Sequence, residues 1–254
     1  MKNPIRGGNI HRHGDGCGES RMKFKNLFFE PYVGKNFGTS LLGKRVLVVG
    51  ASHYCTYFHQ EIGCGERCGH YDAGSCRDFT NDVMECYFNR ANGDEGWMHT
   101  YSKFFNTFFE CMPTDEVRRG LIETIAFMNY LQGVEGHDAN EKNTTLFVDK
   151  RNFNALLDVI DDLEVEVIIT WGNRVWDAFW SHQSEFETFK SNNGTDVKFD
   201  TLKLSDGTDA RDVFAITVKG RRVIVVGLYH PSSTSLYKND PQALYRLAGI
   251  NILK

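Results

Sequence analysis

The stretch Lys44-Arg-Val-Leu-Val-Val-Gly50 decides the fold class, because four apolar residues run without interruption up to its closing glycine. Strands with one solvated face alternate apolar and polar residues, whereas a continuous apolar run indicates a strand that is buried on both faces, as in a parallel sheet covered by helices. Val165-Glu-Val-Ile-Ile-Thr-Trp171 and the β-branched run within 222–228 have a similar character, and a shorter strand is expected at 125–129.

Helical patterns occupy the intervals between these strands. They are expected at 79–90, at 98–111, from 114 onward, at 152–163, at 173–180 and at 241–250. Residues 213–218 and 222–228 are expected to pair as a hairpin across Lys219-Gly220. Strands that alternate with helices are typical of a three-layer αβα domain with a mainly parallel central sheet. We expect one such α/β domain over 23–254, after a flexible N-terminal arm at 1–22 that has no hydrophobic period.

The composition is that of an ordinary globular protein. Of 254 residues, 41% are hydrophobic and 24% are charged, and no apolar run approaches the ~20 residues that span a bilayer. We therefore expect a cytoplasmic protein that does not contact a membrane. A net charge of −4 argues against indiscriminate coating of nucleic acid, but it leaves room for a local basic groove. Short clusters of Lys and Arg occur at 44–45, 118–119, 219–222, 238 and 246, and several of them flank expected strand ends. Taken singly, each is interpreted as a solvated charge at the end of an element.

Polar side chains follow three of the expected strands at the point where each strand ends. The segments are Gly50-Ala-Ser-His-Tyr54, Asn129-Tyr130 and His230-Pro-Ser-Ser233. The carboxyl ends of parallel strands meet at one edge of the sheet, which is where open α/β sheets bind ligands. An amide can read the hydrogen-bonding edge of a nucleobase, an aromatic ring can stack on its face, and an imidazole can stabilise negative charge on a departing base. This set of groups suits the extraction of a single base from a nucleic-acid strand.

Five short motifs occur in a fixed order along residues 40 to 250. They are Val48-Val-Gly50-Ala-Ser-His-Tyr54, Phe79-Thr80, Ile125-Ala-Phe-Met-Asn129, Ile168-Ile-Thr-Trp171-Gly172 and His230-Pro231-Ser232-Ser233. In this order they resemble the motifs of the uracil-DNA glycosylase superfamily. Those motifs are a strand followed by Gly-x-Asp-Pro-Tyr, a phenylalanine that stacks on the base, an apolar strand ending in an asparagine, a Leu-Trp-Gly strand and a His-Pro-Ser-Pro loop. The chain would be a divergent member of that superfamily.

The resemblance implies a DNA glycosylase-like protein of the same fold that acts as a monomer. It would hydrolyse the N-glycosidic bond of a flipped uracil-like or modified base in DNA, and this reaction needs no cofactor. The residues implied to bind the base are Gly50, Tyr54, Phe79 and Asn129, and His230 would support departure of the base. The residues implied to hold the DNA are Ser232, Ser233, Leu236, Tyr237 and Lys238. Of these, Leu236 and Tyr237 would insert an apolar wedge into the duplex, although Leu236 can equally be read as packing onto the terminal helix.

The first motif departs from the superfamily pattern. Ser52 stands where efficient members have a water-activating aspartate, and His53 replaces the proline. Ser52 and His53 are candidate catalytic residues. A hydroxyl can orient water, but it cannot neutralise an oxocarbenium-like sugar as a carboxylate does, so the negative charge that this reaction uses is missing from the motif. A carboxylate downstream would restore that charge, and the sequence offers Asp72, Asp78, Asp82 and Glu61. Otherwise the substrate differs from uracil, or activity has been lost.

Six potential soft-metal ligands lie between Cys55 and Cys76, in a loop rich in Gly and Cys at 51–77. The candidate ligands are Cys55, Cys64, Cys68 and Cys76, with His59 and His70 as alternates. Thiolate and imidazole are the ligands that zinc prefers, and four thiolates can also hold an iron–sulfur cluster. The spacing matches no zinc-finger pattern and differs from that of the superfamily members with a cluster. Either a structural metal holds the loop, or its thiols are simply reduced.

Three functions remain open from the sequence alone. The first is a DNA glycosylase used in repair or in defence against foreign DNA. The second is a catalytically inactive member that binds nucleic acid or a nucleobase through the same pocket, which Ser52 favours. The third is a metal-dependent hydrolase that uses the His/Cys loop as its active site.

Overall fold

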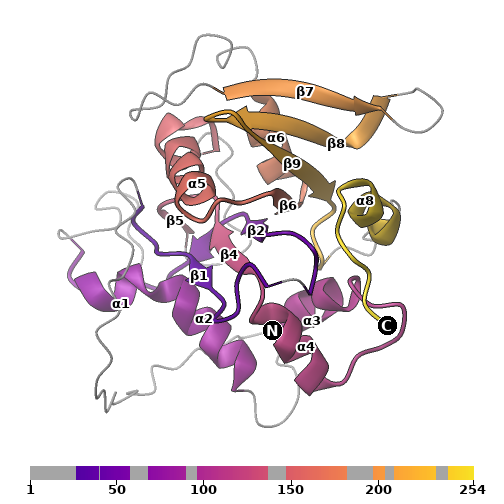
Figure 1. Ribbon diagram of the computed structural model, residues 1–254. Coiled ribbons are helices and arrows are strands. Elements are labelled where there is room, and N and C mark those ends of the chain that lie inside the picture. Colours follow the sequence, from indigo (N-terminus) through magenta and orange to yellow (C-terminus); the bar gives the residue numbers. More distant parts are fainter. Residues whose placement is uncertain are drawn as a thin grey trace.

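The computed structural model describes residues 27–39, 41–57, 68–89, 96–136, 147–181, 197–203, 209–232 and 240–254. Within them a seven-stranded sheet has the order β1-β4-β2-β6-β9-β8-β7, and β3 pairs with β5 beside it (Figure 1). The strands are β1 Tyr32–Val33, β2 Val46–Gly50, β3 His53–Tyr54, β4 Ala126–Asn129, β5 Val134–Gly136, β6 Val167–Trp171, β7 Val197–Lys203, β8 Asp209–Val218 and β9 Arg221–Leu228.

The centre of the sheet is parallel and its edges are antiparallel. Strands β4, β2, β6 and β9 run parallel to one another. Strand β1 pairs antiparallel with β4, and β8 pairs antiparallel with both β9 and β7. The expected parallel core and the 213–228 hairpin are therefore confirmed, within a sheet that is mixed as a whole. Strand β7 was not expected from the sequence, although 197–200 alternates apolar and polar residues.

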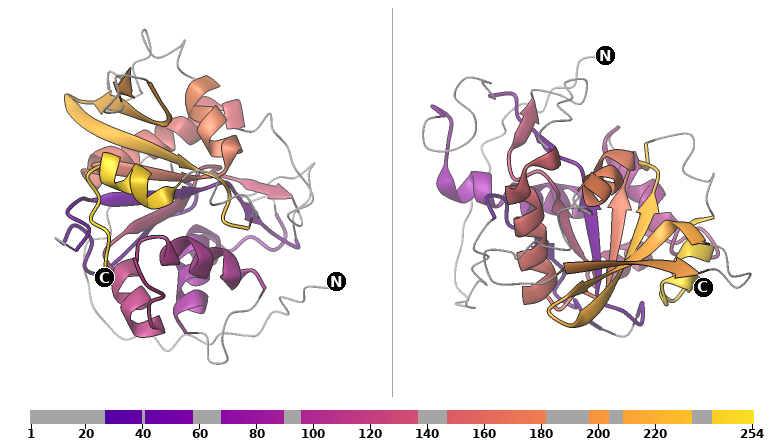
Figure 2. Two further views of the ribbon diagram at one scale, coloured as in Figure 1. Left: turned by 90° about the vertical axis from the view of Figure 1, so that its right-hand side faces the viewer. Right: turned by 90° about the horizontal axis from the view of Figure 1, so that it is seen from above.

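Helices lie on both sides of the sheet (Figure 2). The helices are α1 Ala73–Arg77, α2 Phe79–Phe88, α3 Met98–Asn106, α4 Asp115–Ile122, α5 Lys150–Asp162, α6 Asn173–Ser181 and α8 Pro241–Leu247. Side chains of α5 and α6 share one buried apolar cluster, and those of α2, α3, α4 and α8 share another. Strand β2 supplies Leu47 and Val49 to the first cluster and Val46 and Val48 to the second. The alternation along a fully buried strand shows the three layers directly.

The helix expected at 98–111 ends earlier, at Asn106. The Thr107 hydroxyl donates to the Phe104 carbonyl at 2.6 Å, and the chain then leaves the helix so that Phe109 forms a β-bridge with Leu253. The phenylalanines of this segment are all buried, as expected of core residues. Cys111, which was expected inside this helix, lies beyond it and is exposed.

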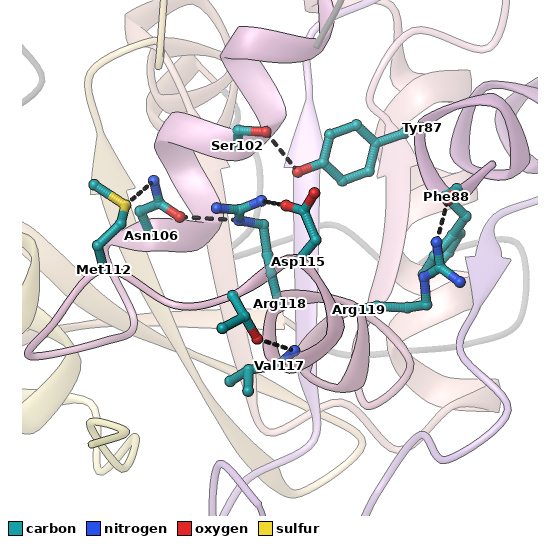
Figure 3. A network of polar contacts seen from close by, with 10 residues as sticks. Tyr87, Phe88, Ser102, Asn106, Met112, Asp115, Val117, Arg118 and Arg119 are labelled. Atoms are coloured by element: carbon teal, nitrogen blue, oxygen red, sulfur yellow. Dashed lines mark hydrogen bonds and ion pairs between the residues drawn. The ribbon is translucent and has the colours of Figure 1, made fainter. Parts of the chain in front are cut away.

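A polar network joins α2, α3 and α4 (Figure 3). Arg118 is 7% exposed, and its Nε donates to the Asn106 side chain at 2.9 Å while its guanidinium pairs with Asp115. A hydrogen bond of 2.8 Å joins the hydroxyls of Tyr87 and Ser102. Because each buried polar group has a partner, this layer of helices keeps a fixed geometry against the sheet.

Helix α6 lies very close to β9 at one point. A Cβ atom on Gly227 would meet the Trp176 ring at 2.5 Å, so the indole packs directly on the glycine backbone. Trp176 also contacts the Phe214 ring, with the centroids 4.9 Å apart. This contact fixes the distance between α6 and the sheet.

Basic residues at the amino ends of the central strands have acidic partners. Lys44 pairs with Glu166 at 3.1 Å, and Arg221 pairs with Asp161 at 2.8 Å. Lys219, in the turn just before Arg221, also pairs with Asp161. Lys44, Lys219 and Arg221 lie at the strand ends opposite the polar segments, and each has an acidic partner. These pairs agree with the interpretation of such clusters as charges at element ends, and these residues do not form a basic groove beside the polar segments.

Candidate functional site

The carboxyl ends of β2 and β4 bring Gly50 and Asn129 together. The two residues are partners in the parallel register, and the next amide, that of Tyr130, donates to the Gly50 carbonyl at 2.9 Å. A Cβ atom on Gly50 would lie 2.3 Å from Asn129 Oδ1, which means that the amide side chain lies over the glycine backbone. Asn129 is 7% exposed. Only glycine leaves the Asn129 amide in this position.

His230 follows β9 at the same edge of the sheet. Its imidazole lies edge-on to the Trp171 ring at the end of β6, with centroids 6.3 Å apart. Gly172, at a positive φ of 86°, leaves room for the backbone and Cβ of His230. Trp171 is buried, whereas His230 is exposed. The strand end therefore holds the histidine backbone firmly and leaves its ring accessible.

The tautomer of His230 follows from its contacts with Ser232. The backbone N–H of Ser232 donates to Nδ1 at 3.2 Å, and the Ser232 hydroxyl lies 2.7 Å from the same nitrogen. Because a backbone N–H can only donate, Nδ1 acts as an acceptor. The ring proton of neutral His230 is therefore on Nε2, where it can donate to a partner.

Ser52 donates a hydrogen bond to Glu135 Oε2 at 2.7 Å. Ser52 lies just after β2 and is half-buried, whereas the Glu135 side chain lies on β5 and is fully enclosed. The carboxylate beside Ser52 is therefore none of the four considered from the sequence. Asp72 instead caps α1 by accepting the backbone N–H groups of Gly74 and Ser75, and Glu61 lies outside the described residues.

Two further groups hold the Glu135 carboxylate. Arg174, on the first turn of α6, reaches both of its oxygens, with a contact of 3.0 Å to Oε2, and the Tyr54 hydroxyl lies 3.4 Å from Oε2. Burial raises the pKa of Tyr54, so its hydroxyl keeps its proton and donates. The Arg174 guanidinium also lies over the Phe147 ring, 4.3 Å from the centroid. This set of donors holds the buried carboxylate in one position and stabilises its charged form.

His53 faces away from this cluster. Its ring is 5% exposed, lies 4.7 Å from the Phe29 and Phe79 ring centroids, and is 2.9 Å from the Thr80 hydroxyl. Burial lowers the pKa of His53 to about 3, so the imidazole is neutral. The geometry favours a packing role, in contrast to the expected role in activating water.

Phe79 and Phe29 line a cavity of about 220 Å³. Neither Asn129 nor His230 is among the residues that line it. The structure thus groups Gly50, Asn129 and His230 along the strand ends and places Phe79 with His53. The expectation that Phe79 and Asn129 face one common cavity is not met in this structure.

The cysteines divide between this cavity and the surface. Cys55, Cys68, Cys76 and the alternate ligand His70 line the cavity. Among the described residues, no three potential ligands lie close enough together to hold a metal ion as they stand. The expected ligands Cys64 and His59 lie outside the described residues, as do the expected DNA-binding residues Ser233, Leu236, Tyr237 and Lys238 and the expected arm at 1–22.

Comparison with protein-family models and with curated proteins finds no match to this chain. The resemblance to the uracil-DNA glycosylase superfamily therefore stays an expectation from the five sequence motifs. Among the helices of the described segments, none combines the length and the apolar character needed to cross a membrane.

Proposed function

We propose that this protein is a DNA glycosylase-like enzyme that hydrolyses the N-glycosidic bond of a flipped base. The observation that carries the proposal is the Ser52–Glu135 pair, because the motif comparison lacked a carboxylate at this position and Glu135 supplies one at 2.7 Å. Glu135 cannot be found from the first motif, since it follows β4 in the chain. Ser52 can orient a water for attack and accept its proton while the serine's own proton passes to Glu135 along the 2.7 Å hydrogen bond.

His230 serves the other half of the reaction. When an N-glycosidic bond breaks, negative charge develops on the departing base. The Nε2–H that is fixed by Ser232 can donate a hydrogen bond to that base, and the position of His230 after β9 keeps the donor in place. Asn129, set over Gly50, offers the amide that would read the edge of the base. Extrusion costs a few kcal/mol, which is least for mispaired or damaged bases.

A second candidate function is base or DNA binding without hydrolysis. The specific observation in its favour is that Arg174 engages both oxygens of Glu135 and that the carboxylate is fully enclosed. The negative charge of Glu135 is then neutralised by Arg174 and does not stabilise a sugar cation. In this case Ser52 and Glu135 would shape the site and His230 would contribute to affinity alone.

An abasic-site assay distinguishes the two functions. Oligonucleotides that carry uracil, hypoxanthine, oxidised bases or hypermodified bases are incubated with the protein and then cleaved with alkali. The proposal expects cleavage at one of these bases and loss of cleavage in His230→Ala. In Ser52→Ala the rate should fall by at least about tenfold, which is the equivalent of one hydrogen bond to a charged group. Binding without cleavage on every substrate would select the second function, and neither binding nor cleavage would reject both.

A further inference from the structure

Three cysteines that lie apart in the sequence meet at one cavity. Cys55 follows β3, Cys68 begins the next described segment, and Cys76 lies in α1. All three are half-buried and line the cavity of about 220 Å³ described above. The other two cysteines of the described segments, Cys86 and Cys111, are exposed and do not line it. The division sorts the described thiols into an inward-facing set and a surface pair.

The backbone around the inward-facing thiols is anchored. The amide of Cys55 donates to the Gly136 carbonyl at 3.0 Å, which ties it to the end of β5. The Cys68 carbonyl accepts from the amide of Tyr71 at 2.9 Å, and the amide of Cys76 donates to the Asp72 carbonyl at 2.8 Å. Each thiol is therefore presented from a fixed turn, strand end or helix.

His70 supplies a fourth soft ligand at the same cavity. Its ring stacks on Tyr57, with the centroids 4.0 Å apart and the planes at 17°. Three thiolates and one imidazole form one of the ligand sets that tetrahedral structural zinc uses. Reduced cysteines with no such role are typically packed as small apolar groups, but these three line the same cavity as an imidazole.

We propose that Cys55, Cys68, Cys76 and His70 form a zinc-binding site in this cavity. In this structure no three of the described ligands lie within reach of one ion, so binding zinc must bring their side chains closer together. Zinc would then add binding free energy to the fold and hold the segments that carry these residues. The proposal does not depend on the proposed function, because metal binding here involves neither His230 nor Asn129.

The test measures zinc directly in the full chain, purified under reducing conditions without chelator. Elemental analysis should find about one zinc ion per chain, with an X-ray absorption spectrum dominated by Zn–S distances of about 2.3 Å. Cys55→Ser, Cys68→Ser, Cys76→Ser and His70→Ala should each lower the zinc content. Cys86→Ser and Cys111→Ser are matched controls that should keep it. Zinc content that is unchanged in the four ligand variants would overturn the site.

A second measurement uses only the wild-type chain and so does not depend on the folding of variants. In alkylation followed by mass spectrometry, Cys55, Cys68 and Cys76 should be protected until a chelator is added, whereas Cys86 and Cys111 should react at one rate throughout. Chelation should also lower the Tm, and added zinc should restore it. Equal alkylation with and without chelator, or iron with labile sulfide in place of zinc, would refute the assignment. Neither measurement uses DNA, so a failed cleavage assay leaves this result intact.

Discussion

Ser52 and Glu135 are joined by a 2.7 Å hydrogen bond although they are 83 positions apart in the sequence. The contact depends on the short pairing of β3 with β5, which brings His53 opposite Val134. The hydroxyl is half-buried, whereas the carboxylate behind it is fully enclosed and paired with Arg174. The charge near the first motif is thus supplied from another part of the chain.

Replacing Glu135 with Gln should strongly destabilise the fold. The change leaves the Arg174 guanidinium, whose side chain is 24% exposed, without its counter-charge. Breaking a buried ion pair costs about 3–5 kcal/mol, and urea unfolding should show a loss in this range. Glu164→Gln is the matched control, because its pair with Arg45 has side chains that are 61% and 41% exposed. That control should change the unfolding free energy by at most about 1 kcal/mol. Equal effects of the two changes would contradict the reading of Glu135.

Gly50→Ala should disturb both the fold and the site. The new Cβ would be 2.3 Å from Asn129 Oδ1 and 3.1 Å from the Phe127 ring, so the amide must move. We expect a loss of about 1–3 kcal/mol in unfolding free energy, together with weaker binding of any base-containing ligand. Gly120→Ala is the control, because no atom lies within 4 Å of its added Cβ in α4. It should raise stability by about 1 kcal/mol. A Gly50→Ala protein with wild-type stability and binding would show that Asn129 is not held as described.

The stability of the chain should fall in acid because of His53. Burial lowers the pKa of this imidazole from 6.5 to about 3, so between these values the unfolded chain binds a proton that the folded chain does not. The contribution of neutral His53 to the free energy of unfolding is fully present above pH 6.5. It is lost as the pH falls below that value, by up to about 1.4 kcal/mol per pH unit. His53→Gln should flatten this part of the curve of unfolding free energy against pH. Independently, the His53 ring signals in NMR should not titrate between pH 7 and 5, and a midpoint near 6.5 would refute the burial argument.

Ser232→Ala should slow base removal without abolishing it. The variant keeps the backbone N–H that fixes the His230 tautomer but loses the hydroxyl 2.7 Å from Nδ1. One neutral hydrogen bond is worth about 1 kcal/mol, so a roughly fivefold lower rate is expected. Nitrogen NMR should show the Nε2–H tautomer in both proteins. A spectrum with the proton on Nδ1 would remove the basis for His230 as a donor to the base.

The strands and their ends could be predicted because burial on both faces leaves a strong sequence signal. The runs ending at Gly50, Asn129 and Trp171 are such strands, and their polar successors do share one edge of the sheet. Glu135 could not be predicted, since β5 has three residues and its partner β3 has two, which is too short for any hydrophobic period. A single glutamate between Val134 and Gly136 is the only sequence signal of a buried charge.

The orientation of His53 was also beyond the sequence. An imidazole next to a candidate catalytic serine suggests chemistry, but strand residues alternate sides, and in β3 the side of His53 is lined by Phe29 and Phe79. The same limit applies to the basic clusters, because the acidic partners of Lys44 and Lys219 come from segments more than fifty residues away, at Glu166 and Asp161.

The absence of a side chain at Gly227 has an effect beyond its own strand. Trp176 rests on that bare backbone, and two residues earlier the same helix presents Arg174 to Glu135. A methyl group at 227 would collide with the Trp176 ring, so the ring or the helix that carries both Trp176 and Arg174 would have to shift. The missing side chain at Gly227 therefore helps to set the position of α6, and with it the position of the Arg174 guanidinium against Glu135.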